Sequence, residues 1–136
     1  MTQAGFFIIA ACLAVLIGLY SHWRQPRPLE SPRKHGTVDF VIDGDTIILK
    51  GVEQRIRLWG VDAAEQGEDG FREARNWLVK MVEGRKVSYI PMDTDKYNRI
   101  VARVFFGDGQ EINRVMIERG LVSEYCKYSR GFYDYC

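Results

Sequence analysis

Cysteine and histidine are scarce in this chain: its 136 residues include three cysteines and two histidines. They are too few and too scattered to form a structural zinc site, which takes four such ligands at close, regular spacing. Internal repeats and low-complexity segments are absent as well. The length and a hydrophobic content of 46% suffice for one globular domain but not for two.

An excess of charge of one sign is also missing, because the formal net charge is only +1. The first 34 residues are basic, and residues 35–136 keep 15 basic against 17 acidic side chains. A protein that holds DNA through its overall field should be clearly basic. Any role in nucleic-acid chemistry must therefore come from a local site, with a metal ion offsetting the acidic groups.

A long apolar run occurs at residues 6–20, and no charged side chain precedes Arg24. Residues 1–24 are therefore predicted to form a membrane-spanning helix with Tyr20 and Trp23 at the interface. A cleaved signal segment is the alternative, although a basic start and a small-residue cleavage site are not clear. Residues 25–35 hold three of the four prolines and are predicted to be an extended linker.

Residues 36–136 are predicted to be the globular domain. Runs rich in β-branched residues, separated by turn signals, predict five strands, at 37–42, 46–50, 54–61, 86–90 and 99–106. Pro91 is expected to end the fourth strand. Helical spacing predicts one helix from Phe71 to a cap at Gly84 and a second over 110–119 with a cap at Gly120.

The order of these elements favours a small closed sheet over a parallel βαβ arrangement, because one helix follows the third strand and the other follows the fifth. We therefore predict a mainly β domain of the α+β class, a five-stranded OB-fold barrel with two helices, preceded by the membrane helix. The tail, residues 121–136, is aromatic and is expected to be irregular.

Four carboxylates lie close to the ends of the first three predicted strands. Asp43 and Asp45 flank Gly44 in a hairpin turn, and turn chemistry alone explains them. Asp62 and Glu65, however, end a strand that should pair with this hairpin. Clustered carboxylates repel unless a cation lies among them, and oxygen ligands select a hard cation such as calcium or magnesium. An EF-hand is excluded, because the glycine and glutamate that its loop requires are missing.

Arg57 and Arg99 stand on predicted strands near these acids. A solvated strand face is one explanation for them. The other is functional, because guanidinium groups bind phosphate oxygens in pairs, carboxylates hold a metal, and one acid is left as a base. That combination of residue types is suited to hydrolysis of a phosphodiester.

Four fragments in order and at compatible spacing, VIDGDT, RIRLWGVDAAE, DKYNR and ERGL, resemble the staphylococcal nuclease-like (thermonuclease) family over residues 36–125. The resemblance implies a calcium-dependent nuclease of OB-barrel fold that cuts single-stranded DNA and RNA to 3′-phosphate products. A non-catalytic, membrane-tethered OB-fold module that binds oligonucleotides or a partner is the alternative. No protein partner is inferred.

The resemblance also implies roles for the acidic residues. The metal ligands are Asp45, Asp62 and the backbone carbonyl of Ala63, and the acid that matches the proposed general base is Glu65. Asp43 matches an acidic position beside the metal.

On the substrate side, the resemblance implies that Arg57 and Arg99 are the catalytic arginines that bind the phosphate. Lys96 and Tyr97 match positions near the terminal phosphate and the base of the substrate.

Two departures from the family pattern concern the loop and the tail. The usual Thr-Pro is replaced by Ala63-Ala64; a carbonyl ligand does not depend on its own side chain, but the loop that aims Glu65 is expected to be looser. The long C-terminal helix of the family has no room here. The tail is expected to be pinned by a Cys126–Cys136 disulfide, with two unpaired thiols as the alternative, and Tyr125 or Tyr128 to wall the base pocket.

The side of the membrane is contested by two observations. The basic residues after the apolar run favour a cytoplasmic domain by the positive-inside rule. The cysteine pair and the implied calcium dependence favour an oxidising compartment. We expect the domain on the outer or periplasmic face, with secretion after cleavage as the alternative.

Overall fold

The computed structural model describes residues 32–136. The predicted membrane helix and most of the predicted linker lie outside these residues. Within residues 32–136, no helix combines the length and the apolar character that crossing a membrane requires.

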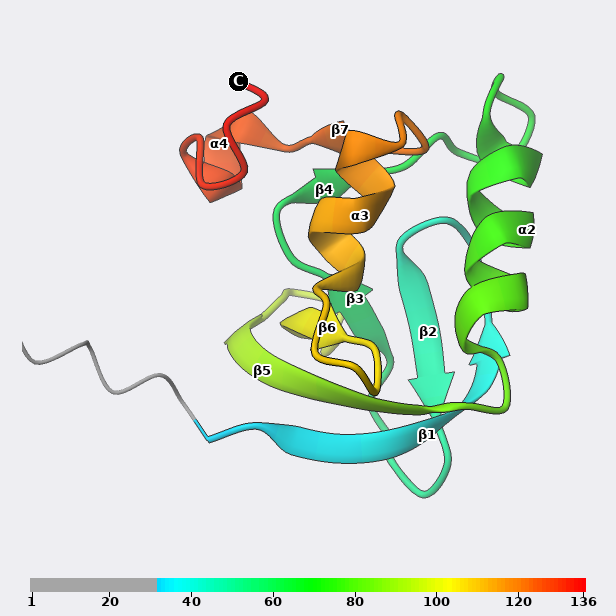
Figure 1. Cartoon of the computed structure of the whole chain (residues 1–136). Coiled ribbons are helices and arrows are strands. Elements are labelled where there is room, and N and C mark those ends of the chain that lie inside the picture. The colour runs from blue at the N-terminus through cyan, green and yellow to red at the C-terminus, as the bar shows by residue number, and fades with distance from the viewer. Residues whose placement is uncertain (1–31) are drawn as a thin grey trace, which may run out of the picture. The chain divides into compact units, whose positions relative to one another are not determined.

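A closed five-stranded barrel forms the centre of the described region (Figure 1). Its strands follow each other around the barrel in the order β1-β2-β3-β6-β5, and β5 closes onto β1. All neighbours are antiparallel except β3 and β6, which are parallel. The strands are β1 (Lys34–Val41), β2 (Thr46–Leu49), β3 (Ile56–Leu58), β5 (Lys86–Thr94) and β6 (Ile100–Phe105). The predicted five-stranded, mainly β barrel is therefore confirmed.

Three strand boundaries differ from the prediction. β1 begins at Lys34, within the segment assigned to the linker. β5 does not stop at Pro91 but continues to Thr94, because a register shift between Pro91 and Asp93 accommodates the missing N–H in a bulge. The predicted third strand is two strands, since Gly60 (φ 69°) turns the chain between β3 and the short β4 (Val61–Asp62).

Two helices cover the barrel, α2 (Phe71–Val82) against β1 and α3 (Ile112–Glu118) against β6. Gly84 and Gly120 follow them with φ of 75° and 67°, which confirms the predicted caps. The core lies inside the barrel and under both helices. Its fully buried side chains come from the strands, from the inner faces of the helices and, at Tyr133, from the tail: Val38, Val41, Ile56, Leu58, Val61, Ala74, Val82, Ala102, Val104, Ile112, Met116 and Tyr133.

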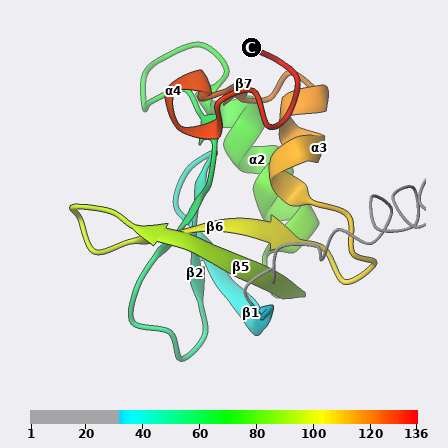
Figure 2. The same ribbon diagram turned by 90° about the vertical axis from the view of Figure 1, so that its left-hand side faces the viewer.

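The C-terminal tail is ordered, so the expectation of an irregular segment is wrong. The strand β7 (Ser123–Glu124) pairs with β4, and α4 (Cys126–Ser129) follows as a third, short helix. Figure 1 places β4, β7 and α4 at the same end of the barrel, and Figure 2 shows β7 and α4 together at that end. The Cys126–Cys136 disulfide is present and closes a ten-residue separation around α4.

A buried tyrosine docks this tail on the barrel. The Tyr133 side chain is fully buried, its ring lies 5.9 Å from that of Trp59, and its hydroxyl donates to Glu111 at 2.5 Å. Burial and the neighbouring Glu111 carboxylate raise the pKa of Tyr133, so the phenol remains a donor. A Cβ at Gly60 would lie 3.0 Å from this ring, so glycine is required there for close packing as well as for its φ.

Candidate functional site

Asp45 lies at the end of the turn between β1 and β2. Its N–H donates to the Asp43 carboxylate at 3.0 Å, which closes the turn. Gly44 does not supply a positive φ here. It is buried, and a Cβ at this position would lie 2.9 Å from the Cβ of Ala74 and 3.0 Å from that of Ala63. Glycine therefore lets the Asp45 turn pack between α2 and the loop that follows β4.

Arg57 faces Asp45 across the β2–β3 pair. Thr46 pairs with Arg57, and the Leu58 N–H donates to the Asp45 carbonyl at 2.7 Å. The Arg57 guanidinium donates from Nη2 to Asp45 Oδ2 at 3.2 Å and from Nη1 to the Leu58 carbonyl at 3.1 Å. Three of its five N–H donors are then left for a ligand, and the side chain is 16% exposed.

The loop after β4 is joined to the same carboxylate. The Ala63 N–H donates to Asp45 Oδ2 at 3.3 Å. Asp62, directly before it, pairs with Ser123 of β7 and is exposed. The structure thus brings Asp45, Arg57 and Ala63 into contact and holds Asp62 next to them along the chain.

Glu65 continues this loop as an exposed residue. Its N–H donates to the Glu68 carboxylate at 2.8 Å and its carbonyl accepts from the Glu68 N–H at 2.9 Å. Within the described region no protein group donates a hydrogen bond to the Glu65 carboxylate. It is therefore open to a water molecule, and Glu68, which sequence reasoning did not identify, fixes the backbone from which it projects.

Arg99 precedes β6 and is held by Asp95. Its Nε donates to Asp95 Oδ2 at 2.7 Å, and its backbone N–H donates to Asp95 Oδ1 at 3.0 Å. Burial raises the pKa of Asp95, but the hydrogen bonds from Arg99 and from the Tyr97 N–H outweigh it and lower that pKa below its usual value. The sequence analysis did not identify Asp95. Its carboxylate accepts from the N–H groups two and four residues later, which is a common pattern in turns.

Lys96 and Tyr97 lie beside this arginine. Tyr97 is 68% exposed, and its ring centroid lies 5.0 Å from Lys96 Nζ and 5.4 Å from the guanidinium carbon of Arg99. An exposed ring flanked by two cations presents a face on which a nucleic-acid base can stack.

Arg57 and Arg99 do not touch each other, but the strand register puts them on one face. Arg57 pairs with Val101 in the parallel β3–β6 ladder, and Arg99 lies two residues before Val101. Paired residues share a face and so do residues two apart. The core-facing neighbours Ile56 and Leu58 are buried, so both arginines belong to the outer face.

The donor chemistry around Asp45 fits a hard cation. Burial raises the pKa of Asp45, and the neighbouring Asp43 charge adds to this effect. The Arg57 charge acts in the opposite direction but does not cancel the increase. Three donors, from Thr46, Arg57 and Ala63, occupy its oxygens, and a carboxylate accepts about four. One acceptor position of a buried anion is left for a cation.

Side chains alone do not complete such a site. No three aspartate, glutamate, histidine or cysteine side chains gather around one metal position in the part of the chain that the structure describes. The implied set needs only two carboxylates, Asp45 and Asp62, plus the Ala63 carbonyl. The Asp45–Ala63 hydrogen bond places the first carboxylate against the segment that carries the other two groups.

Comparison with known proteins gives matches over the same region. A sequence model described as "Staphylococcal nuclease homologue" matches residues 55–135. An uncharacterized endonuclease of Escherichia coli is 34% identical over 97 residues, which are 70% of this chain and 63% of that protein. A probable endonuclease of Komagataella phaffii is 34% identical over 95 residues, 63% of this chain and 42% of its own length.

A plant relative matches over a shorter stretch. The staphylococcal-like nuclease of Arabidopsis thaliana is 34% identical over 76 residues, which cover 56% of this chain and 23% of that protein. The chain thus spans less than two thirds of the length of the relatives it matches.

Proposed function

Because the chain belongs to the family of staphylococcal nuclease homologues, we propose that it is a metal-dependent nuclease that hydrolyses phosphodiester bonds of single-stranded DNA and RNA. The observation that carries the proposal is the contact of Asp45 with both Arg57 and Ala63. It joins a buried carboxylate, a phosphate-binding cation and the loop of Asp62 and Glu65 in one place.

The phosphate is bound by the two arginines. Arg57 is fixed by Asp45 and the Leu58 carbonyl, and Arg99 by Asp95, so both guanidinium groups are oriented before the substrate arrives. Donors fixed in advance stabilise the negative charge that builds up on the phosphoryl oxygens without reorganising. This is why each arginine is held by an acid of its own.

Glu65 is the general base of this proposal. Its carboxylate takes a proton from a water molecule, the water oxygen bonds to phosphorus, and the bond from phosphorus to the 5′ oxygen breaks. The 5′ oxygen takes up a proton from solvent, which leaves a 3′-phosphate and a 5′-hydroxyl. Asp45, Asp62 and the Ala63 carbonyl would hold a calcium ion, which would supply Lewis-acid polarisation of a phosphoryl oxygen.

We extend the proposal to location from the sequence alone. Residues 1–24 anchor the protein in a membrane, with the nuclease domain on the outer or periplasmic face. The disulfide at Cys126–Cys136 agrees with an oxidising compartment.

A cleavage assay on the full chain tests the activity. A labelled single strand is incubated with calcium or with a chelator, using the wild type, Arg57→Lys and the matched control Arg55→Lys. Arg55 is exposed and lies directly before β3, two residues from Arg57. Lysine keeps the charge beside Asp45 but not the planar pair of donors, so Arg57→Lys should lower kcat by about 10²-fold or more.

Two outcomes would decide against the proposal. Strand binding without calcium-dependent cleavage would identify a non-catalytic OB-fold binding module instead. Equal turnover of Arg57→Lys and Arg55→Lys would remove Arg57 from the chemistry.

A further inference from the structure

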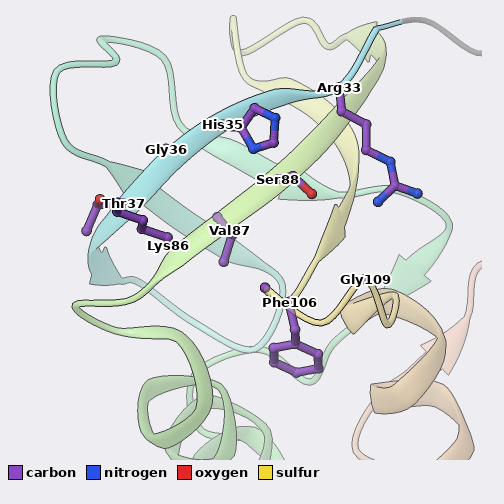
Figure 3. Close-up of a pocket in the computed structure, with 10 residues that line it drawn as sticks. Arg33, His35, Gly36, Thr37, Lys86, Val87, Ser88, Phe106 and Gly109 are labelled. Carbon is purple, nitrogen blue, oxygen red and sulfur yellow. The ribbon is translucent and has the colours of Figure 1, made fainter.

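A groove of about 490 Å³ lies on the outside of the barrel where β1 pairs with β5 (Figure 3). The loop after β6 closes its other side with Phe106, Gly107 and Gly109. We call it the cationic groove, after Arg33 and Lys86, which line it together with His35. None of the residues assigned to phosphodiester cleavage lines it.

The strand register explains why Arg33, His35 and Lys86 gather there. In the antiparallel β1–β5 ladder His35 pairs with Ser88 and Thr37 pairs with Lys86. Paired residues share a face, and so do residues two apart along a strand. The four side chains therefore lie on one face of the ladder, and Arg33, two residues before His35, continues it.

These three side chains have no acidic partner in the part of the chain that the structure describes. Among residues 32–136, neither Arg33 nor His35 nor Lys86 forms an ion pair. The Arg33 guanidinium carbon lies 3.9 Å from the Phe105 ring centroid, a cation–π contact that orients the group and leaves its N–H donors available. The nearby Asp108 accepts from the Gln110 N–H at 3.0 Å and lines a neighbouring hollow, which shares Lys86, Phe106 and Gly107 with the groove.

A ligand that fits this groove carries both phosphate and planar rings. Arg33 and Lys86 supply donors for phosphate oxygens, and the exposed His35 ring supplies a surface on which a base can stack (Figure 3). Phe106, whose ring packs against Trp77, closes the groove on the other side. Gly107 and Gly109 keep side chains out of the opposite wall. Single-stranded nucleic acid combines these two features in every unit.

The groove also lies on the strands that lead to the cleavage site. Phe105 pairs with Ser88 at the groove end of the β5–β6 ladder, and Ile100, next to Arg99, pairs with Thr94 at the other end. Five residues of β6 separate the two ends, roughly 17 Å at the usual rise of a strand. One extended strand of a few nucleotides spans that distance.

We propose that the cationic groove is a second binding site for the single-stranded substrate, which holds phosphate and base at a distance from the bond that is cut. The inference rests on the proposed nuclease function for its ligand. It needs no chemistry of its own.

Binding without cleavage tests the groove separately from the activity. The full chain in detergent and chelator is titrated into a labelled strand of about 20 nucleotides, and anisotropy is followed at several salt concentrations. The groove variant is Arg33→Glu/Lys86→Glu. The control, Lys50→Glu/Lys80→Glu, makes the same change in net charge at exposed positions of the β2 turn and α2.

The groove variant should bind at least on the order of tenfold more weakly than the control, and its dependence of log K on log salt should be less steep by about 1.4, the value for two lost single-strand phosphate contacts. His35→Ala, which leaves the formal charge at neutral pH unchanged, should also weaken binding. Weaker binding by His35→Ala would show that the strand contacts the groove locally and is not held only by the electrostatic field of the protein.

Three results would overturn the inference. Equal weakening by groove and control variants would leave only overall charge. Unchanged DNA affinity with lost binding to vesicles of anionic lipid would assign the groove to a membrane surface. Wild-type affinity in all variants would leave it without a role. A wild type that binds DNA through the groove but does not cleave it would contradict the proposed function alone.

Discussion

The hydroxyl of Tyr133 donates a 2.5 Å hydrogen bond to Glu111, and the same carboxylate accepts hydrogen bonds from Nε and Nη2 of Arg103. The tail is thereby joined through one acid to the start of α3 and to strand β6, whose Arg103 lies eight residues before that acid. Tyr133 is fully buried, so the tail behaves as part of the core and not as an appendage.

Tyr133→Phe should therefore destabilise the protein although it keeps the ring. A hydrogen bond to a charged group contributes about 1.5–3 kcal/mol, so the free energy of unfolding from urea titration should fall by about that amount. Tyr135→Phe is the control, because Tyr135 is 57% exposed and only its backbone N–H binds Glu124. Equal stability of the two variants would show that the Glu111 contact contributes nothing.

Gly44→Ala should disturb both the fold and the site. The new Cβ would lie 2.9 Å from Ala74 and 3.0 Å from Ala63, which is overpacking and costs typically about 1–3 kcal/mol. Because the displaced Ala63 binds Asp45, calcium affinity should fall as well. Thermal unfolding and calcium titration measure the two effects.

Gly107→Ala is the matched control for this change. A Cβ there meets no atom within 4 Å, and Gly107 has no positive φ. If Gly107→Ala lost as much stability as Gly44→Ala, the loss in Gly44→Ala would not come from the contacts of the new Cβ with α2 and the loop after β4.

Asp95→Asn should impair the orientation of Arg99 and leave its charge in place. The asparagine amide is uncharged, so it loses the charge-assisted hydrogen bond that Arg99 Nε donates to Asp95 at 2.7 Å in the wild type. Misorientation of a group that stabilises the transition state lowers kcat by up to about 10²-fold and should affect KM less. Asp93→Asn, an exposed neighbour, is the control, and a change in KM alone would show that Asp95 does not position Arg99 for the reaction.

Glu124 should make stability depend on pH. Burial raises the pKa of its carboxyl, but hydrogen bonds from the Ser129 hydroxyl and the N–H groups of Tyr133 and Tyr135 outweigh it, so the pKa lies below its ordinary value of 4.5. Its stabilisation is therefore complete above that ordinary value and is lost as pH falls through the lowered pKa.

Glu124→Gln tests this, measured as the urea midpoint between neutral and acid pH. The variant should be less stable at neutral pH, and the difference from the wild type should shrink on acidification. Glu53→Gln, at an exposed turn position, should change neither. A constant difference at every pH would mean that the charge of Glu124 is not what stabilises the tail.

Local signals predicted most of the barrel. Alternating β-branched residues indicate strands at β1, β2 and β6, and apolar spacing at Phe71, Ala74 and Leu78 indicates α2, because these patterns depend only on neighbours in the sequence. The acids and arginines were found from their types and order. Their contact with one another, such as Asp45 with Ala63, follows from the closed sheet.

What could not be predicted depends on distant contacts. Tyr133 is one of three tyrosines within its ten-residue disulfide loop, and only its packing on Gly60 and Glu111 distinguishes it. β7 is two residues long and is defined by its partner, β4. Pro91 was expected to end its strand. The strand continues because of a bulge in its pairing with β6, and the local sequence around Pro91 does not predict that bulge.

The pairing of β4 with β7 has a consequence for how far the site depends on the barrel. Asp62 lies opposite Ser123, so the loop that carries the acids is aligned by a strand outside the barrel. All five barrel strands lie within residues 34–105. Loss of the β4–β7 pairing would therefore misalign this loop while the barrel strands keep their order.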